Sequence, residues 1–139
     1  MADPLSIIGI CAVALKAVVQ AKDFVENIHR APSLVQSIAD DLKAIEGLLR
    51  ELGTLLEGTD LATHAAIKRW VQTAQTSCEE IMKEVNKLIR PYTTRDKAAD
   101  ITIWKRFSFT FRSSGVAKLQ RDMASCKQTL NLAITCASL

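Results

Sequence analysis

The chain has 139 residues, of which 48% are hydrophobic, so it suits one domain with a real core and disorder is excluded. Aromatic residues make up only 5%, and there are 5 glycines and 3 prolines, a balance that argues against a β-sandwich or barrel and favours helices. The formal net charge of +3 is unevenly spread: residues 1–60 sum to −4 and residues 61–139 to +7. This asymmetry indicates either an anionic partner for one end of the molecule or simply a solvated surface.

The first predicted helix covers about residues 4–30. Asp3 is expected to cap it and Pro4 to open it, since proline suits the first helical position and aspartate accepts the free amide hydrogens there. The segment carries no charge from residue 5 to residue 15, and Lys16 is its first charge after Asp3. A helix that is apolar on nearly every face belongs in a protein core or in lipid. With one charge in 17 residues, the run to residue 21 lies at the lower edge of what a spanning helix needs.

Three further helices are predicted over about residues 33–56, 61–90 and 115–139, each with one apolar stripe at alternating 3- and 4-residue spacing. The stripes are Ile38, Leu42, Ile45, Leu49, Leu52 and Leu56; Ile67, Val71, Ala74, Cys78, Ile81, Val85 and Leu88; and Val116, Leu119, Met123, Cys126, Leu130, Ala133 and Ala137. Such spacing is typical of helices that pack side by side. The sequence therefore predicts an all-α, antiparallel bundle of four to five helices spanning residues 1–139 as one domain.

Between the last two stripes, residues 92–100 are predicted to form a polar loop. Trp104 follows, and Phe107, Phe109 and Phe111 then alternate with polar residues, a pattern that fits a short extended segment or, alternatively, a helical turn from Trp104.

No catalytic site, metal site or cofactor is predicted. His29 and His64 have no partner at a spacing typical of a nucleophile or metal set, and the four cysteines contain no Cys-x-x-Cys pair. We expect free, mostly buried cysteines, and we expect the adjacent carboxylates Asp40 and Asp41 to lie on a solvated face. The aromatics within the basic stretch from Lys105 to Arg121 could stack on bases, but they occupy packing positions, so nucleic acid is not the expected partner.

The opening residues 1–6 and the apolar helix after them resemble the HeLo-like N-terminal domain of fungal STAND (NLR-like) proteins. Residues 104–107, Leu119 and residues 127–133 resemble the closing helix of that family in order and spacing, and residues 31–33 fit the start of its second helix. The resemblance extends over essentially the whole chain.

This resemblance implies a bundle related to the HeLo cell-death domain and to the four-helix bundle of the necroptosis pseudokinase. It implies a membrane-permeabilising cell-death effector of fungal innate immunity and heterokaryon incompatibility, which an attached sensor or amyloid-forming region activates by oligomerisation. The domain would be cytoplasmic at rest and at the plasma membrane when active. The chain itself carries neither attached region, so we expect it to be the excised domain.

The expected partners are therefore anionic membrane lipids, further copies of the chain, and the C-terminal sensor or amyloid-forming region of the full-length protein. The residues expected to insert into the membrane are Leu5, Ile7, Ile8, Ile10, Val13 and Leu15. Those expected to contact lipid head groups are Lys105, Arg106, Arg112, Lys118 and Arg121. The alternative is a non-lytic oligomerisation or adaptor module of a STAND receptor, for which the apolar first helix is simply core.

Overall fold

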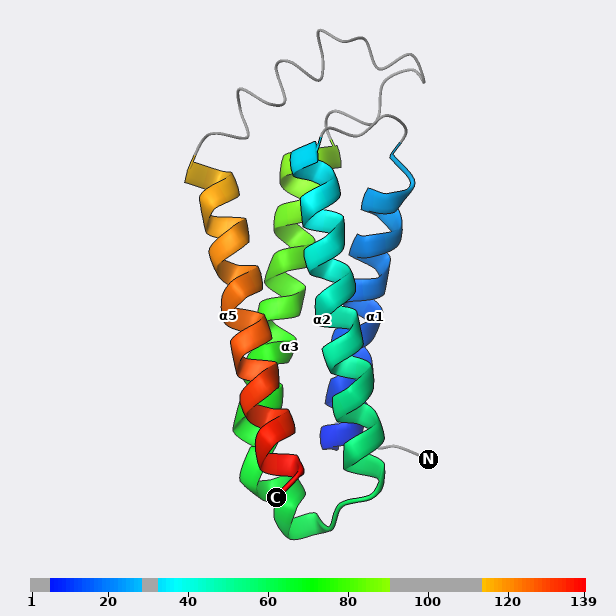
Figure 1. Cartoon of the computed structure of the whole chain (residues 1–139), viewed down its shortest axis with the longest axis vertical. Coiled ribbons are helices and arrows are strands. Elements are labelled where there is room, and N and C mark those ends of the chain that lie inside the picture. Colours follow the sequence, from blue (N-terminus) through cyan, green and yellow to red (C-terminus); the bar gives the residue numbers. More distant parts are fainter. Residues whose placement is uncertain (1–5, 29–32, 91–113) are drawn as a thin grey trace, which may run out of the picture.

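The computed structural model describes residues 6–28, 33–90 and 114–139, and within them every regular element is an α-helix (Figure 1). The helices are α1 (Ile7–Glu26), α2 (Ser33–Glu57), α3 (Leu61–Ile89) and α5 (Ser114–Ala137). Helices consecutive in the chain run in opposite directions (Figure 1). The predicted all-α antiparallel bundle is confirmed, with four helices in the described part. The expected loop at residues 92–100 and the aromatic segment around Phe107 lie outside it.

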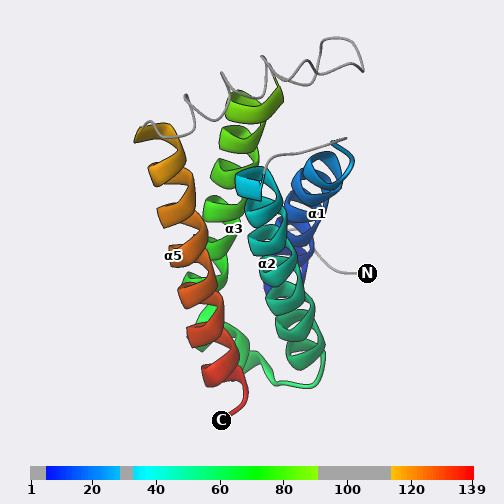
Figure 2. The ribbon, with the colours of Figure 1, turned by 45° about the horizontal axis from the view of Figure 1, so that its top comes forward.

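The four helices form a ring in the order α1, α2, α5, α3, in which each helix packs against two neighbours. The principal contacts join α1 to α2, α2 to α5, α5 to α3, and α3 to α1. Although only three residues connect α2 to α3, these two helices lie on a diagonal of the ring, as do α1 and α5 (Figure 2). Two of the neighbouring pairs, α1 with α3 and α2 with α5, are consequently parallel.

The three apolar stripes form the centre of this ring. Every stripe residue of α2 and α5 is buried, and in α3 only Leu88 is half-buried while the adjacent Ile89 is fully buried. Ile89 can take the buried position expected for Leu88 because the two residues follow Val85 by four and three positions, and both spacings return to the same helix face. Burial at the predicted spacing confirms that heptad-type periodicity determines which face of each of these helices packs inward.

Two helix ends differ from the prediction. α1 begins at Ile7 rather than at Pro4, because Ser6 has an extended backbone and its hydroxyl accepts a hydrogen bond from the Gly9 amide at 3.1 Å. It ends at Glu26 rather than near Arg30. Asn27 follows as the C-cap, and its backbone N–H donates to the Asp23 carbonyl. In α3, Asp60 is the N-cap, and its side chain accepts a hydrogen bond from the Thr63 amide; the sequence leaves Thr59 and Asp60 as alternatives for this cap.

Candidate functional site

The predicted membrane-inserting residues lie on different faces of α1. Ile7 and Ile10 are buried in the core, Ile8 and Leu15 are half-buried, and Val13 is 42% exposed. Leu5 lies outside the described residues. The helix that looks apolar on every side in the sequence therefore buries one face, packs Ile8 and Leu15 against the edge of the core, and leaves Val13 exposed.

The outer face of α1 is apolar over its first three turns. Ala12 and Val13 are exposed there, Ile8 and Val19 are half-buried, and Lys16 supplies the one positive charge among them. With two exposed and two half-buried aliphatic side chains around one charge, this face is less polar than the outer face of a typical solvated helix.

The inner face of α1 combines small side chains with branched aliphatic ones. Its buried side chains are those of Ile7, Ile10, Cys11, Ala14, Ala17, Val18, Ala21 and Val25. The largest fully buried side chains of the described chain come instead from the other three helices: Ile38, Leu42, Ile45, Leu49, Leu52, Leu56, Ile67, Ile81, Ile89, Leu119 and Met123.

A few polar contacts add to the attachment of α1. The Lys22 ammonium donates to a Glu46 carboxylate oxygen of α2 at 2.6 Å, and Arg50 holds the other oxygen of the same carboxylate at 2.8 Å. These two cations lower the pKa of Glu46 below its usual range. The Cys11 thiol donates to the Leu49 carbonyl at 3.5 Å, and the Arg90 guanidinium lies 4.7 Å from the centre of the Phe24 ring.

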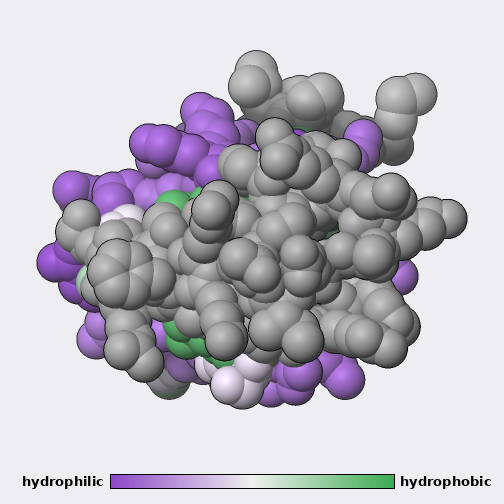
Figure 3. All heavy atoms as spheres, turned by 90° about the horizontal axis from the view of Figure 1, so that it is seen from above, coloured by the Kyte–Doolittle hydropathy of each residue, from purple (hydrophilic) through white to green (hydrophobic). Residues whose placement is uncertain are grey.

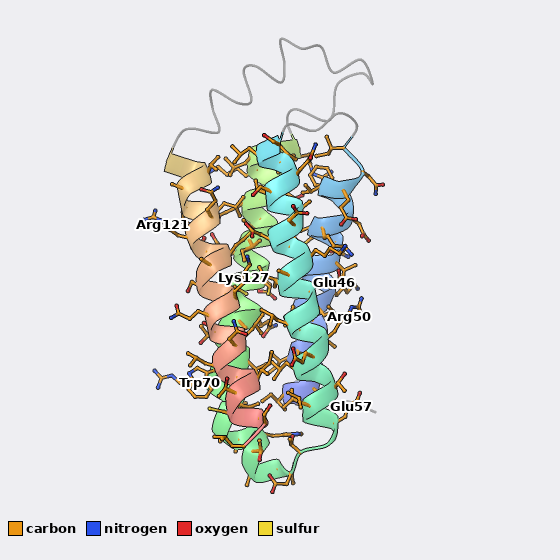
Figure 4. The ribbon with its side chains drawn as sticks, viewed as in Figure 1. Glu46, Arg50, Glu57, Trp70, Arg121 and Lys127 are labelled. Carbon is orange, nitrogen blue, oxygen red and sulfur yellow. The ribbon has the colours of Figure 1, made fainter. Side chains whose placement is uncertain are left out.

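Of the predicted head-group residues, the structure describes Lys118 and Arg121; Lys105, Arg106 and Arg112 lie outside the described residues. Lys118 pairs with Glu84 in a short contact, with Glu80 at 3.5 Å and with Asp122 at 3.4 Å. Its charge is therefore largely compensated within the bundle. Arg121 is exposed and projects away from α5 (Figure 4), and it forms no ion pair with the described residues.

The carboxylate network around Lys118 borders a hollow of about 250 Å³ between α3 and α5. Glu84 lies at its edge with 8% of its surface exposed, and its Oε2 atom has no hydrogen-bond partner among the described residues. Burial raises the pKa of Glu84, against the opposing effect of Lys118. Lys83 and Lys87 also line the hollow, so its charges are mixed rather than uniformly basic. The sequence indicates the burial of Glu84 only by its spacing, since it lies three residues after the stripe residue Ile81 and therefore on the same helix face.

The end of the bundle at which α2 and α5 begin is viewed in Figure 3, where the described side chains around its edge are mainly hydrophilic.

Asp41, expected on a solvated face, instead accepts from Lys127 of α5 at 2.6 Å, so it helps to join α2 to α5. Asp40 next to it is exposed as expected.

The polar groups that could support chemistry have structural contacts. The Nε2 atom of His64 lies 2.8 Å from the Leu56 carbonyl, at the end of α2. Cys11, Cys78 and Cys126 are free and buried, as expected, and Cys136 is free and half-buried. Within residues 6–28, 33–90 and 114–139, no group of three or more histidine, cysteine or acidic side chains is placed to hold a metal ion. None of the helices in these ranges is both long enough and apolar enough to cross a membrane.

Fold and surface together define a small helical-bundle domain whose distinguishing feature is an N-terminal helix with apolar side chains on both faces. Residues 2–139 match the family model described as the N-terminal domain of the pigment biosynthesis cluster protein PigL, and the chain belongs to that family. No curated protein and no solved structure matches the chain. Membership of this family is compatible with the resemblance to HeLo-like domains, but it is a less specific assignment than that resemblance.

Proposed function

We propose that this domain is a membrane-permeabilising effector in which α1 leaves the bundle and enters the bilayer. One observation supports the proposal: Val13 is 42% exposed on α1, beside the exposed Ala12, while Ile8 and Leu15 are only partly buried at the edge of the core. Such a helix already presents part of the apolar surface that lipid favours.

A single copy of α1 is poorly suited to insertion on its own. The uncharged stretch of residues 5–15 would span roughly 16 Å as a continuous helix, which is about half the thickness of a hydrocarbon core. Extending the inserted segment beyond it places Lys16 in lipid, at a cost of about 2.5–3.5 kcal/mol near the bilayer centre. Several copies acting together would thin the bilayer or line a wet defect with Lys16 facing water. These two costs favour activation by clustering, and the family resemblance suggests that an attached sensor or amyloid-forming region of the full-length protein brings the copies together.

Docking on the membrane before insertion is assigned mainly to Arg121, together with Lys105, Arg106 and Arg112 outside the described residues. The compensated charge of Lys118 makes it a weaker candidate than its position in the basic stretch suggests. In this proposal the resting protein is cytoplasmic and the active protein is at the plasma membrane.

The test compares two matched substitutions. Val13 on α1 and Leu132 on α5 are aliphatic side chains of similar exposure, 42% and 48%, so replacing either by glutamate should leave the fold intact. Leakage of a dye from vesicles of phosphatidylcholine and phosphatidylserine should be lost in Val13→Glu and kept in Leu132→Glu. Equal leakage from both folded variants would show that α1 is not the membrane-active element.

The second candidate is a non-lytic oligomerisation or adaptor module. The depth at which the inner face of α1 packs favours it, since Ala14 and Val18 are 0% and 1% exposed and belong to the same core as the other helices. If this candidate is right, clustered protein self-associates without dye leakage, and Val13→Glu changes self-association instead.

A further inference from the structure

Two buried cysteines meet in the core between α3 and α5. The Sγ atoms of Cys78 and Cys126 lie 3.7 Å apart, and both side chains are 0% exposed. Both are free thiols, and they are 48 residues apart in the chain. The contact therefore joins two helices that are neighbours in the ring but distant in sequence.

The geometry suits a covalent bond between these sulfurs. Helices packed at ~8–10 Å with Cα atoms at a radius of ~2.3 Å bring facing Cα atoms to roughly 3.4–5.4 Å, which overlaps the range of ~4.4–6.8 Å that a disulfide spans. The sulfurs are already near contact distance, so small side-chain rotations and a slight approach of the helices suffice to form the bond.

The pairing is also selective. Cys11 is the third buried cysteine, but its thiol is directed to the Leu49 carbonyl of α2 at 3.5 Å. Cys136 is half-buried near the C-terminal end of α5, two turns or more beyond Cys126. Among the four thiols, which all lie in the described residues, the sulfur–sulfur contact is that of Cys78 with Cys126.

We propose that Cys78 and Cys126 are a disulfide site, at which a hydroperoxide covalently joins α3 to α5 when the bundle opens locally. The hydroperoxide first oxidises one thiolate to a sulfenic acid and is itself reduced to the alcohol. The second thiolate then attacks the sulfenic sulfur, forms the S–S bond and expels water. Overall, two thiols lose two electrons and two protons, and the peroxide accepts both.

Burial controls when this reaction occurs. The contact with Cys126 and removal from water raise the pKa of the Cys78 thiol, whereas the same contact lowers the pKa of the Cys126 thiol, so the Cys78 thiolate is scarce in the closed bundle. Oxidant must also reach a side chain that has no exposed surface. The disulfide should therefore form in proportion to the time that α3 and α5 spend apart, and it then prevents their separation. Neither cysteine lies on α1 or α2, so the motion of those helices stays free.

The experiment treats purified protein with hydrogen peroxide across a series of sub-denaturing urea concentrations. Trypsin releases Cys78 within residues 70–83 and Cys126 within residues 122–127, so mass spectrometry of the unreduced digest identifies the pairing. We expect a monomer with these two peptides linked, a mass lower by two hydrogens, and formation that accelerates with urea. Closing a loop of this length should raise the melting temperature by roughly 5–15 °C, reversibly with dithiothreitol.

Two variants sharpen the test. Cys136→Ser should form the link as wild type does, and Cys126→Ala should not form it. If Cys126→Ala fails to fold, the wild-type and Cys136→Ser peptide maps decide the matter by themselves. Linkage through Cys11 or Cys136, over-oxidation of both thiols without a link, or thiols that stay free while amide exchange reports opening of α3 would each overturn the proposal.

Discussion

Replacing Ala14 by leucine should weaken the attachment of α1 and at the same time raise the membrane activity of the domain. Ala14 is 0% exposed on the inner face of α1, within the single core that all four helices share. A leucine adds three carbon atoms where no space is available, while helix propensity changes little. The clash exists only while α1 is docked, so the substitution favours the released state.

The size of the effect follows from this packing. Inserting extra methylene groups into a close-packed core costs about 1–3 kcal/mol. If the cost acts only on the docked state, the population with α1 released should rise by roughly 5- to 150-fold. This increase would be visible as faster amide exchange in α1 than in α2 or α5, and as dye leakage at lower protein concentration.

A matched control separates release of α1 from general destabilisation. Ala133→Leu places the same extra carbons at a position of α5 that is also 0% exposed, on the helix diagonal to α1. It should lower the melting temperature by a similar amount without selective exchange of α1. The reasoning would be refuted if both variants leak equally, or if Ala14→Leu accelerates exchange uniformly over all four helices.

Three further predictions concern the core, the ion pairs and the lipid contact. Leu49→Ala should destabilise by about 2–5 kcal/mol in urea unfolding, because it opens a cavity at a side chain that is 1% exposed, and an unchanged midpoint would contradict the core assignment. Lys22 and Arg50 lower the pKa of Glu46, so its carboxylate stabilises the fold at pH values above its pKa in the unfolded chain, near ~4.3. This stabilisation is lost as the pH falls through the lower pKa that Glu46 has in the folded protein. The melting temperature of Glu46→Gln should therefore lie below wild type at pH 7 and approach it at acid pH, whereas a constant gap would exclude the linkage. Arg121→Glu should weaken co-sedimentation with phosphatidylserine vesicles by about five-fold or more at low salt, with Lys68→Glu on α3 as the control.

The repeating stripes could be predicted because each depends on one helix alone. A residue spaced three or four positions from the next apolar residue returns to the same face, whichever helix covers it. The lower precision at the start of α1 has an equally local cause. Asp3 and Ser6 are both good capping residues, and sequence preference alone does not say which of them accepts the first amide hydrogens.

The candidate site depends on contacts that sequence patterns do not contain. α1 has no polar face over its first turns, so periodicity could not say which side of it is buried. Lys118 reaches Glu84, and Lys127 reaches Asp41, across 34 and 86 residues of chain. Charge runs predicted a basic surface at Lys118, but neutralisation by partners brought in from α3 can be known only once the helices are placed.

The ring order of the helices also bears on how the domain could come apart. Because α1 lies diagonally opposite α5, its departure breaks its contacts with α2 and α3 but leaves both α2 and α3 packed against α5. The remaining three helices then form one contiguous layer, with α5 packed between α2 and α3. Loss of a corner helix can thus be a sub-global transition rather than complete unfolding, with α1 as one cooperative unit and α2, α5 and α3 as another.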